Sequence, residues 1–184
     1  NSRDHPRSFA GYNARAIFQD KAGSFWCGSN NGISFYHPSR DEFNSAPYNQ
    51  LDNLLNFTTV NHMVFDRNLM IIGTDDQGLL FFNPLNKFSH KIKILEFEIS
   101  GKHVRKKVER NSFKALLVDH EANLWFSSDS ELVRVRRNSF LNSFERKDST
   151  LLVLSPDLTF KRNQDSGLYS RVISKLLEDK HGRI

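Results

Sequence analysis

Four polar residues occupy matching places in the chain, each five positions before an aspartate and each within an otherwise apolar run. They are Arg15, Asn61, Lys114 and Ser174. Their guanidinium, amide, ammonium and hydroxyl groups can donate hydrogen bonds to the hydroxyl, carboxylate or sulfate groups of a ligand. A ring of such groups around a concave centre suits the binding of a polar ligand. The alternative is that these residues are polar because they line a water-filled channel.

Three short polar segments follow the next predicted strands and extend this set. They are Ser29-Asn30-Asn31, Thr74-Asp75-Asp76 and Ser128-Asp129-Ser130. The adjacent carboxylates of Asp75 and Asp76 could carry out acid–base chemistry, although aspartate is also a common turn residue. In an antiparallel meander, the start of strand one and the end of strand two share a face. The candidate ligand-binding residues on that face are Arg15, Asn30, Asn31, Asn61, Asp75, Asp76, Lys114, Asp129 and Ser174.

Motifs for catalysis, metal binding or cofactor binding are absent from the sequence. The seven histidines include no pair with the spacing of metal ligands. There is no Gly-x-Ser-x-Gly elbow and no glycine-rich phosphate loop. The single cysteine, Cys27, is interpreted as a small buried hydrophobic residue, and it cannot form a disulfide within the chain. We therefore predict no catalytic residue, no metal and no cofactor.

The elements that would position the candidate residues are short strands joined by tight turns. Residues 14–20, 24–29 and 32–36 are rich in aromatic and β-branched side chains, and Asp-x-x-Gly and Asn-Asn-Gly separate them. Glycine and asparagine tolerate the positive φ that tight turns need. This unit predicts a three-stranded antiparallel meander.

The unit recurs with a period of roughly 40 to 50 residues, and four short strands per period are typical of propeller blades. The aspartate that ends each first strand recurs as Asp20, Asp66, Asp119 and Asp179. Because it appears in every copy, we interpret it as a turn-former and not as a catalytic group. The fourth strand of each copy is expected near Phe43, Phe88 and Phe144.

An apolar position six residues or so after each aspartate also recurs. Trp26, Ile71 and Trp125 occupy it, and we predict that all three are buried between sheets. The third copy departs from the others, since Ala122 stands at the turn glycine and Ser127 at the strand glycine.

These residues resemble the two-component regulator propeller repeat. That repeat reads as an apolar strand ending in Glu-Asp or Gln-Asp, then x-x-Gly-x-Leu-Trp-x-Gly-Thr, then x-x-Gly-Leu and an aromatic residue. The best match is Gln19-Asp20-Lys21-Ala22-Gly23-Ser24-Phe25-Trp26-Cys27-Gly28-Ser29-Asn30-Asn31-Gly32-Ile33. Other matches are Gly73-Thr74 with Gly78-Leu79, and Leu177-Glu178-Asp179-Lys180-His181-Gly182-Arg183-Ile184. Pattern and resemblance together predict an all-β fold, a β-propeller fragment of about three and a half four-stranded blades.

The repeat divides the chain into five predicted segments. Residues 1–11 form the tail of a preceding blade, 12–57 a blade, 58–108 a blade with a long outer link, 109–165 a blade, and 166–184 the start of a further, truncated blade. An open array of blades exposes the apolar faces of its terminal blades. We therefore expect the remaining blades of the same propeller as partners, and self-association of the isolated chain.

The resemblance implies a function as well as a fold. Such repeats form the periplasmic sensor region of bacterial hybrid two-component proteins. The expectation is therefore a ligand-sensing module, with an oligosaccharide as the ligand and without its own catalysis. It would lie on the periplasmic side of the inner membrane, in a membrane-anchored sensor histidine kinase. An oligosaccharide and a second copy of the chain are the candidate partners. The alternatives are a carbohydrate-active lyase or glycosidase on a propeller scaffold, and a protein–protein interaction scaffold.

The formal net charge of +5 raises the question of nucleic-acid binding. Basic residues cluster at 102–107 and at Arg134, Arg136 and Arg137. Binding would need these residues on one face beside stacking aromatic residues. Solvated loops and charged strand edges account for both clusters, so we expect no direct nucleic-acid binding and contact with a membrane only through the rest of the parent chain.

Overall fold

The computed structural model describes residues 9, 11–45, 55, 58–83, 88–99, 102–107, 112–128, 131–138, 152–154, 156–161, 168 and 172–184. Within these ranges the regular structure is β-strand, and helical conformation is confined to Leu55 and residues 137–138. No helix in this part of the chain has the length and apolar composition needed to cross a membrane.

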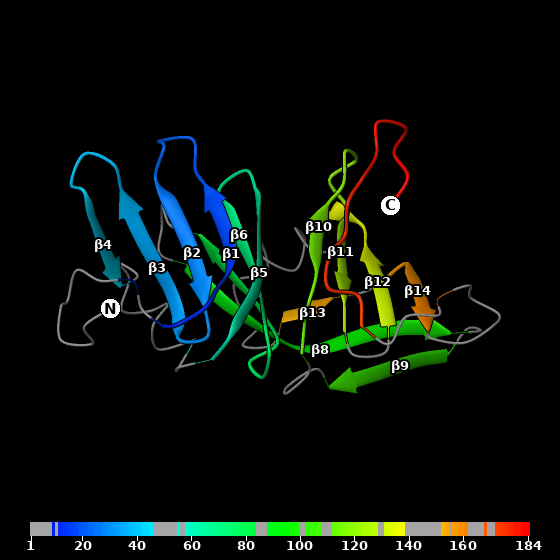
Figure 1. Ribbon diagram of the computed structural model, residues 1–184. Coiled ribbons are helices and arrows are strands. Elements are labelled where there is room, and N and C mark those ends of the chain that lie inside the picture. The colour runs from blue at the N-terminus through cyan, green and yellow to red at the C-terminus, as the bar shows by residue number, and fades with distance from the viewer. Residues whose placement is uncertain are drawn as a thin grey trace.

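The strands form three successive sheets, which we call the first, second and third blade (Figure 1). The first blade contains β1 (Ala14–Gln19), β2 (Phe25–Ser29), β3 (Gly32–His37) and β4 (Glu42–Ser45). The second contains β5 (Val60–Asp66), β6 (Leu69–Thr74), β7 (Leu79–Asn83) and β8 (Phe88–Ile99). The third contains β10 (Leu116–Val118), β11 (Leu124–Ser127), β12 (Glu131–Val135) and β14 (Leu158–Lys161).

Each blade is an antiparallel meander, and the first strands β1, β5 and β10 are neighbours. This is the arrangement of inner strands in a propeller. The final segment, residues 172–184, continues the series, because Asp179 forms the same turn as Asp20 in the first blade and Asp119 in the third. The predicted all-β, propeller-type fold is confirmed.

The second blade is larger than the repeat pattern predicted. Strand β8 is 12 residues long and pairs with β9 (Lys102–Lys107), so the expected outer link contains a further strand. β8 also pairs in parallel with β13 (Leu152–Leu154), which lies between β12 and β14 in the sequence. The fourth strand of the third blade is β14, after the expected place near Phe144, which itself lies outside the described residues.

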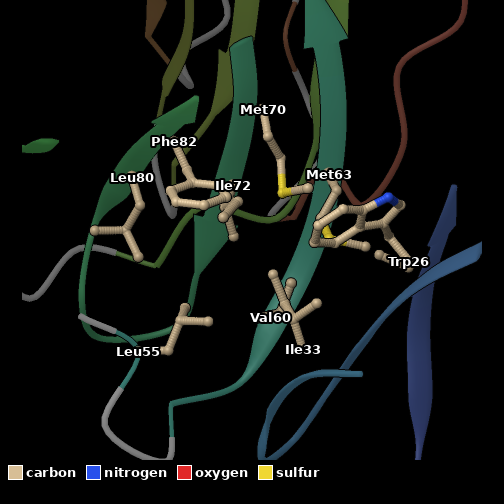
Figure 2. Packing of buried hydrophobic residues seen from close by; sticks show 10 residues of the cluster. Trp26, Ile33, Leu55, Val60, Met63, Met70, Ile72, Leu80 and Phe82 are labelled. Carbon is tan, nitrogen blue, oxygen red and sulfur yellow. The ribbon is translucent and has the colours of Figure 1, made fainter. Parts of the chain in front are cut away.

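Two apolar cores lie between the blades. Figure 2 shows the core between the first and second blades, where Trp26 and Ile33 meet side chains from the second blade. The second-blade residues of this core are Val60, Met63, Met70, Ile72, Leu80 and Phe82. Between the second and third blades, Ile71, Leu79 and Phe81 meet the third-blade residues Phe113, Leu116, Leu124, Phe126, Val133 and Val135.

Strand β6 contributes side chains to both cores. Successive side chains of a strand point to opposite faces, so Met70 and Ile72 reach the first core while Ile71 reaches the second. A strand that is covered on both faces needs a continuous apolar run, as β6 has. The predicted burial of the equivalent residues is confirmed, since Trp26, Ile71 and Trp125 are 3%, 0% and 8% exposed.

The recurring aspartate closes the turn after the first strand in the first and third blades, as predicted. Asp20 Oδ1 accepts hydrogen bonds from the backbone N–H groups of Ala22 and Ser24, both at 2.9 Å. Its Oδ2 accepts the indole N–H of Trp26 at 3.1 Å. In the third blade, Asp119 Oδ2 accepts the indole N–H of Trp125 at 2.9 Å. The aspartate therefore joins the turn to the buried tryptophan of the same blade.

The strand glycine allows the next blade to approach closely. A Cβ added at Gly28 would lie 2.5 Å from Val60 Cγ1, and one added at Gly73 would lie 3.0 Å from the carbonyl oxygen of Phe113. In the third blade the equivalent Ser127 is fully buried, and its hydroxyl donates to the carbonyl of Ile173 at 2.8 Å. A residue at this position must therefore be small or must bond to the following segment.

Candidate functional site

Three of the four predicted inner-strand residues lie together. Arg15 is in β1, Asn61 is in β5, and Lys114 lies two residues before β10. Because these three strands are neighbours, the equal spacing from each aspartate places the three side chains at one end of adjacent strands. Residues from three successive blades thus meet at this edge.

Asn61 connects this group. Its side chain is buried, its Oδ1 accepts a hydrogen bond from Arg15 Nη1 at 3.2 Å, and its Nδ2 donates to Asp75 Oδ1 at 2.8 Å. The same Nδ2 donates to the carbonyl of Phe113 at 3.1 Å. With both ends of its amide engaged, Asn61 fixes the positions of Arg15 and Asp75 relative to the third blade.

Asp75 is the centre of the cluster. Its Oδ1 also accepts a hydrogen bond from Ser112 Oγ at 2.8 Å and forms an ion pair with Lys114 Nζ. The side chains of Lys114 and Asp75 are 27% and 34% exposed, so water reaches both. We call Arg15, Asn61, Asp75, Ser112 and Lys114 the inner polar cluster.

The surroundings of Asp75 keep its carboxyl group ionised. Partial burial by itself raises the pKa of Asp75, but hydrogen bonds from Asn61, Lys114 and Ser112, with the charge of Lys114, lower it to about 2. Oδ1 accepts all three side-chain bonds, and Oδ2 has no hydrogen bond to any described residue. Within the described residues, Asp75 Oδ2 is therefore an unused anionic acceptor near the ammonium group of Lys114.

The other candidate residues lie apart from the cluster or at its margin. Asp76 accepts a hydrogen bond from the hydroxyl of Thr58. Asn30 Oδ1 accepts the backbone N–H of Tyr12 at 2.9 Å, so its side chain anchors the segment that leads into β1. Asn31 and Ser174 are exposed and have no side-chain contact with the inner polar cluster within the described residues. Asp129 lies outside the described residues.

Sequence reasoning missed some of the polar residues near the cluster. Ser112 precedes Lys114 by two positions, so a search limited to one place per repeat does not reach it. Lys175 was also missed, one position after the predicted Ser174. Burial lowers the pKa of His62 on β5, and the positive charge of Lys175 adds to this effect. His62 and Lys175 occupy equivalent positions in their copies, which is the signal that could have identified the pair.

The side chains present favour binding over catalysis. A general acid or base works best when its pKa is close to the operating pH, and the pKa of Asp75 lies far below neutrality. Among the described residues, no group of three or more His, Cys, Asp or Glu side chains could hold a metal ion. Cys27 is buried, burial raises the pKa of its thiol, and it has no disulfide partner. The cluster can offer hydrogen bonds and charge to a polar ligand.

Comparison with known proteins gives a fold but no family. No protein-family model matches the sequence, and no curated protein matches it either. A solved extracellular domain described as part of the hybrid two-component system BT4673 from B. thetaiotaomicron is similar, with a TM-score of 0.64 and 19% identity over 95% of this chain and 20% of that chain. A second structure of the BT4673 extracellular domain, there described as a one-component system, gives a TM-score of 0.60, with 18% identity over 92% of this chain and 19% of that chain.

A third similar structure comes from a different kind of protein. PorZ, a surface component of the type-IX secretion system of Porphyromonas gingivalis, has a TM-score of 0.58 and 18% identity, over 91% of this chain and 23% of that chain. The chain therefore spans about a fifth of the length of the solved proteins it matches. These likenesses establish that the chain has the blade fold of bacterial extracellular and surface proteins.

Proposed function

We propose that this chain is part of an extracytoplasmic sensory module that binds an oligosaccharide at the inner polar cluster and carries out no catalysis. The single observation that carries the proposal is that polar residues from three successive blades form one connected cluster: Asn61 and Lys114 contact Asp75, and Arg15 joins them through Asn61. Part of this group is exposed, and it offers both donors and an acceptor. Sugars are recognised by such mixed sets of polar groups, because each hydroxyl both donates and accepts hydrogen bonds.

Two further findings support a sensory role. The sequence resembles propeller repeats of hybrid two-component sensors, and the fold is that of extracellular domains described for such a system. The module would lie on the periplasmic side of the inner membrane, anchored by another part of its protein. Signalling requires that the ligand bind one arrangement of blades or subunits more tightly than another, and a cluster that joins three blades offers the contacts for this difference.

A surface scaffold is the second candidate function. PorZ belongs to a secretion system and its TM-score of 0.58 is close to those of the BT4673 structures. The fold is therefore compatible with a role in assembly as well as in sensing. The inner polar cluster favours sensing, because a purely structural edge does not need an ion pair that is exposed to water.

Binding measurements on the complete extracytoplasmic region test the proposal. The region is screened against a panel of oligosaccharides, and affinity for a bound glycan is then measured by isothermal titration calorimetry. Replacing Arg15 and Lys114 with alanine should weaken binding by roughly tenfold or more, since each lost charge-assisted hydrogen bond costs about 1.5–3 kcal/mol.

A matched control removes the same two charges from the opposite end of the blades. Lys21 and Arg67 are exposed residues in the turns after β1 and β5. Replacing both with alanine should leave the affinity unchanged. Unchanged binding by the Arg15 and Lys114 variant, or loss only in the control variant, would contradict the proposed site.

A further inference from the structure

The charges of the inner polar cluster are largely balanced within the cluster. Lys114 is paired with Asp75, and Asp76 adds a second carboxylate at the next position, held by Thr58. Arg15 supplies the other cation, bonded to the neutral amide of Asn61. The site thus has no pair of unpaired cations with which to hold a polyanion.

Charged groups farther along the first strands do not change this balance at Asp75. Lys175 is exposed and acts on His62, whose lowered pKa keeps the imidazole neutral at pH 7. Neither residue bonds to the inner polar cluster within the described part of the chain. The groups that a ligand meets at the cluster are therefore those of Arg15, Lys114 and Asp75.

The free positions on these groups alternate between donor and acceptor. Asp75 Oδ2 is an acceptor without a described partner. Among the described residues, Arg15 Nε and Nη2 also have no hydrogen-bond partner, and Lys114 has further ammonium protons. A hydroxyl group of a sugar can donate to Oδ2 while a neighbouring hydroxyl oxygen accepts from Arg15 or Lys114. An ionised carboxylate or a sulfate ester cannot donate to Asp75 and would be repelled by its charge.

We propose that the inner polar cluster selects neutral, hydroxyl-rich sugars over sugars that carry carboxylate or sulfate groups, with Asp75 as the specificity-determining residue. This inference rests on the proposed function, since it assigns the class of ligand at the same site. Specificity of this kind combines attraction for one ligand with repulsion of the other. The carboxylate of Asp75 supplies both effects.

A two-class glycan panel tests the inference on the complete extracytoplasmic region. The neutral class contains malto-, xylo- and manno-oligosaccharides, and the acidic class contains oligogalacturonates and chondroitin sulfate oligosaccharides. The wild-type region should bind a member of the neutral class. In D75N the amide oxygen can still accept from Asn61, Ser112 and Lys114, but the charge is lost. Affinity for the neutral glycan should fall roughly tenfold or more, and binding of acidic glycans should increase.

D41N is the matched control, because it makes the same chemical change at an exposed residue in the turn between β3 and β4, at the opposite end of the blades. It should alter affinity for the neutral glycan by less than about threefold, and thermal unfolding should show both variants folded. Wild-type binding of acidic glycans alone would overturn the inference but leave the proposed function standing. Equal losses in D75N and D41N, or an unchanged D75N, would overturn the role of Asp75. A wild-type region that binds neither class would overturn the proposed function itself.

Discussion

At the scale of single residues, the repeated aspartate uses its two oxygens differently. One oxygen accepts backbone N–H groups of the turn, and the other accepts the indole N–H of the core tryptophan, as at Asp20 and Trp26. The second blade has Ile71 in place of tryptophan and so lacks that N–H. There Asp66 Oδ2 forms an ion pair with Arg137 Nε of the third blade at 3.5 Å. In the second blade, the repeated aspartate therefore interacts with the next blade. In the first blade, it joins the turn to the tryptophan of its own blade.

Ala122 has a backbone conformation that is unfavourable for a residue with a Cβ atom. It has a φ of 61° at the place where Gly23 and Gly182 have 84° and 77°. A left-handed conformation costs a residue with a Cβ about 1–2 kcal/mol, part of which is offset by the greater freedom of glycine in the unfolded chain. Ala122→Gly should therefore stabilise the protein by about 1 kcal/mol in urea unfolding. Gly23→Ala makes the reverse change and should destabilise by a similar amount. A loss of stability in Ala122→Gly would contradict this account.

Asp75 should make stability depend on acid pH. Its pKa is lowered from an ordinary value of 3.8 to about 2, so the folded protein holds the ionised form more strongly than the unfolded chain does. The resulting stability is complete above about pH 4 and is lost as the pH falls towards 2. After allowance for solvent screening, we expect about 1 kcal/mol. In urea unfolding between pH 2 and 5, the free energy of unfolding should fall less on acidification in D75N than in the wild type. An equal pH dependence in the two proteins would contradict the prediction.

At the scale of elements, the sequence predicted strands well where turn chemistry recurs. The turns at Asp20 and Asp119 carry the same signal and form the same hydrogen bonds. The sequence did not predict that β13 pairs with β8, because that contact joins residues far apart in the chain and leaves no local pattern. The fourth strand of the third blade, β14, also lies later in the sequence than the expected place near Phe144.

The candidate site was predictable to a similar degree. Equal spacing from the aspartates placed Arg15, Asn61 and Lys114 at one edge, since equivalent strand positions in adjacent blades lie side by side. The spacing did not show that Asn30 differs from the residues of the cluster. Its side chain accepts a hydrogen bond from the backbone N–H of Tyr12. That difference depends on the path of the segment before β1, which no repeat encodes.

The spacing between blades depends on a missing side chain at Gly28. A Cβ there would lie 2.5 Å from Val60 Cγ1 and 3.0 Å from its Cβ. Gly28→Ala should therefore cost about 1–3 kcal/mol by overpacking. In Gly28→Ala with Val60→Ala, the clash is relieved, so the combined loss in urea unfolding should be smaller than the sum of the single losses. Additive losses would show that the two blades do not meet at this point.

At the scale of the whole molecule, the inner polar cluster and the two cores connect the same blades. The core of Trp26 joins the first blade to the second, and the core of Phe126 joins the second to the third. At the inner edge, the hydrogen bond from Arg15 to Asn61 crosses the first boundary, and the ion pair of Lys114 with Asp75 crosses the second. A ligand that binds there contacts all three blades, so a change in blade arrangement can change its affinity.

The outer faces of the array should drive self-association of the 184-residue chain. Ile17 on the first blade is 67% exposed, and Leu177 in the final segment is 79% exposed. A large apolar side chain with this exposure is expected on a surface that another element covers, and the terminal units of stacked repeats need a polar outer face to stay soluble. Sedimentation velocity over a range of concentrations should show oligomers or aggregates. Ile17→Thr with Leu177→Gln should shift the distribution towards monomer, whereas Lys21→Ala, an exposed polar change, should not. A wild-type chain that remains monomeric at the highest concentration would contradict the prediction.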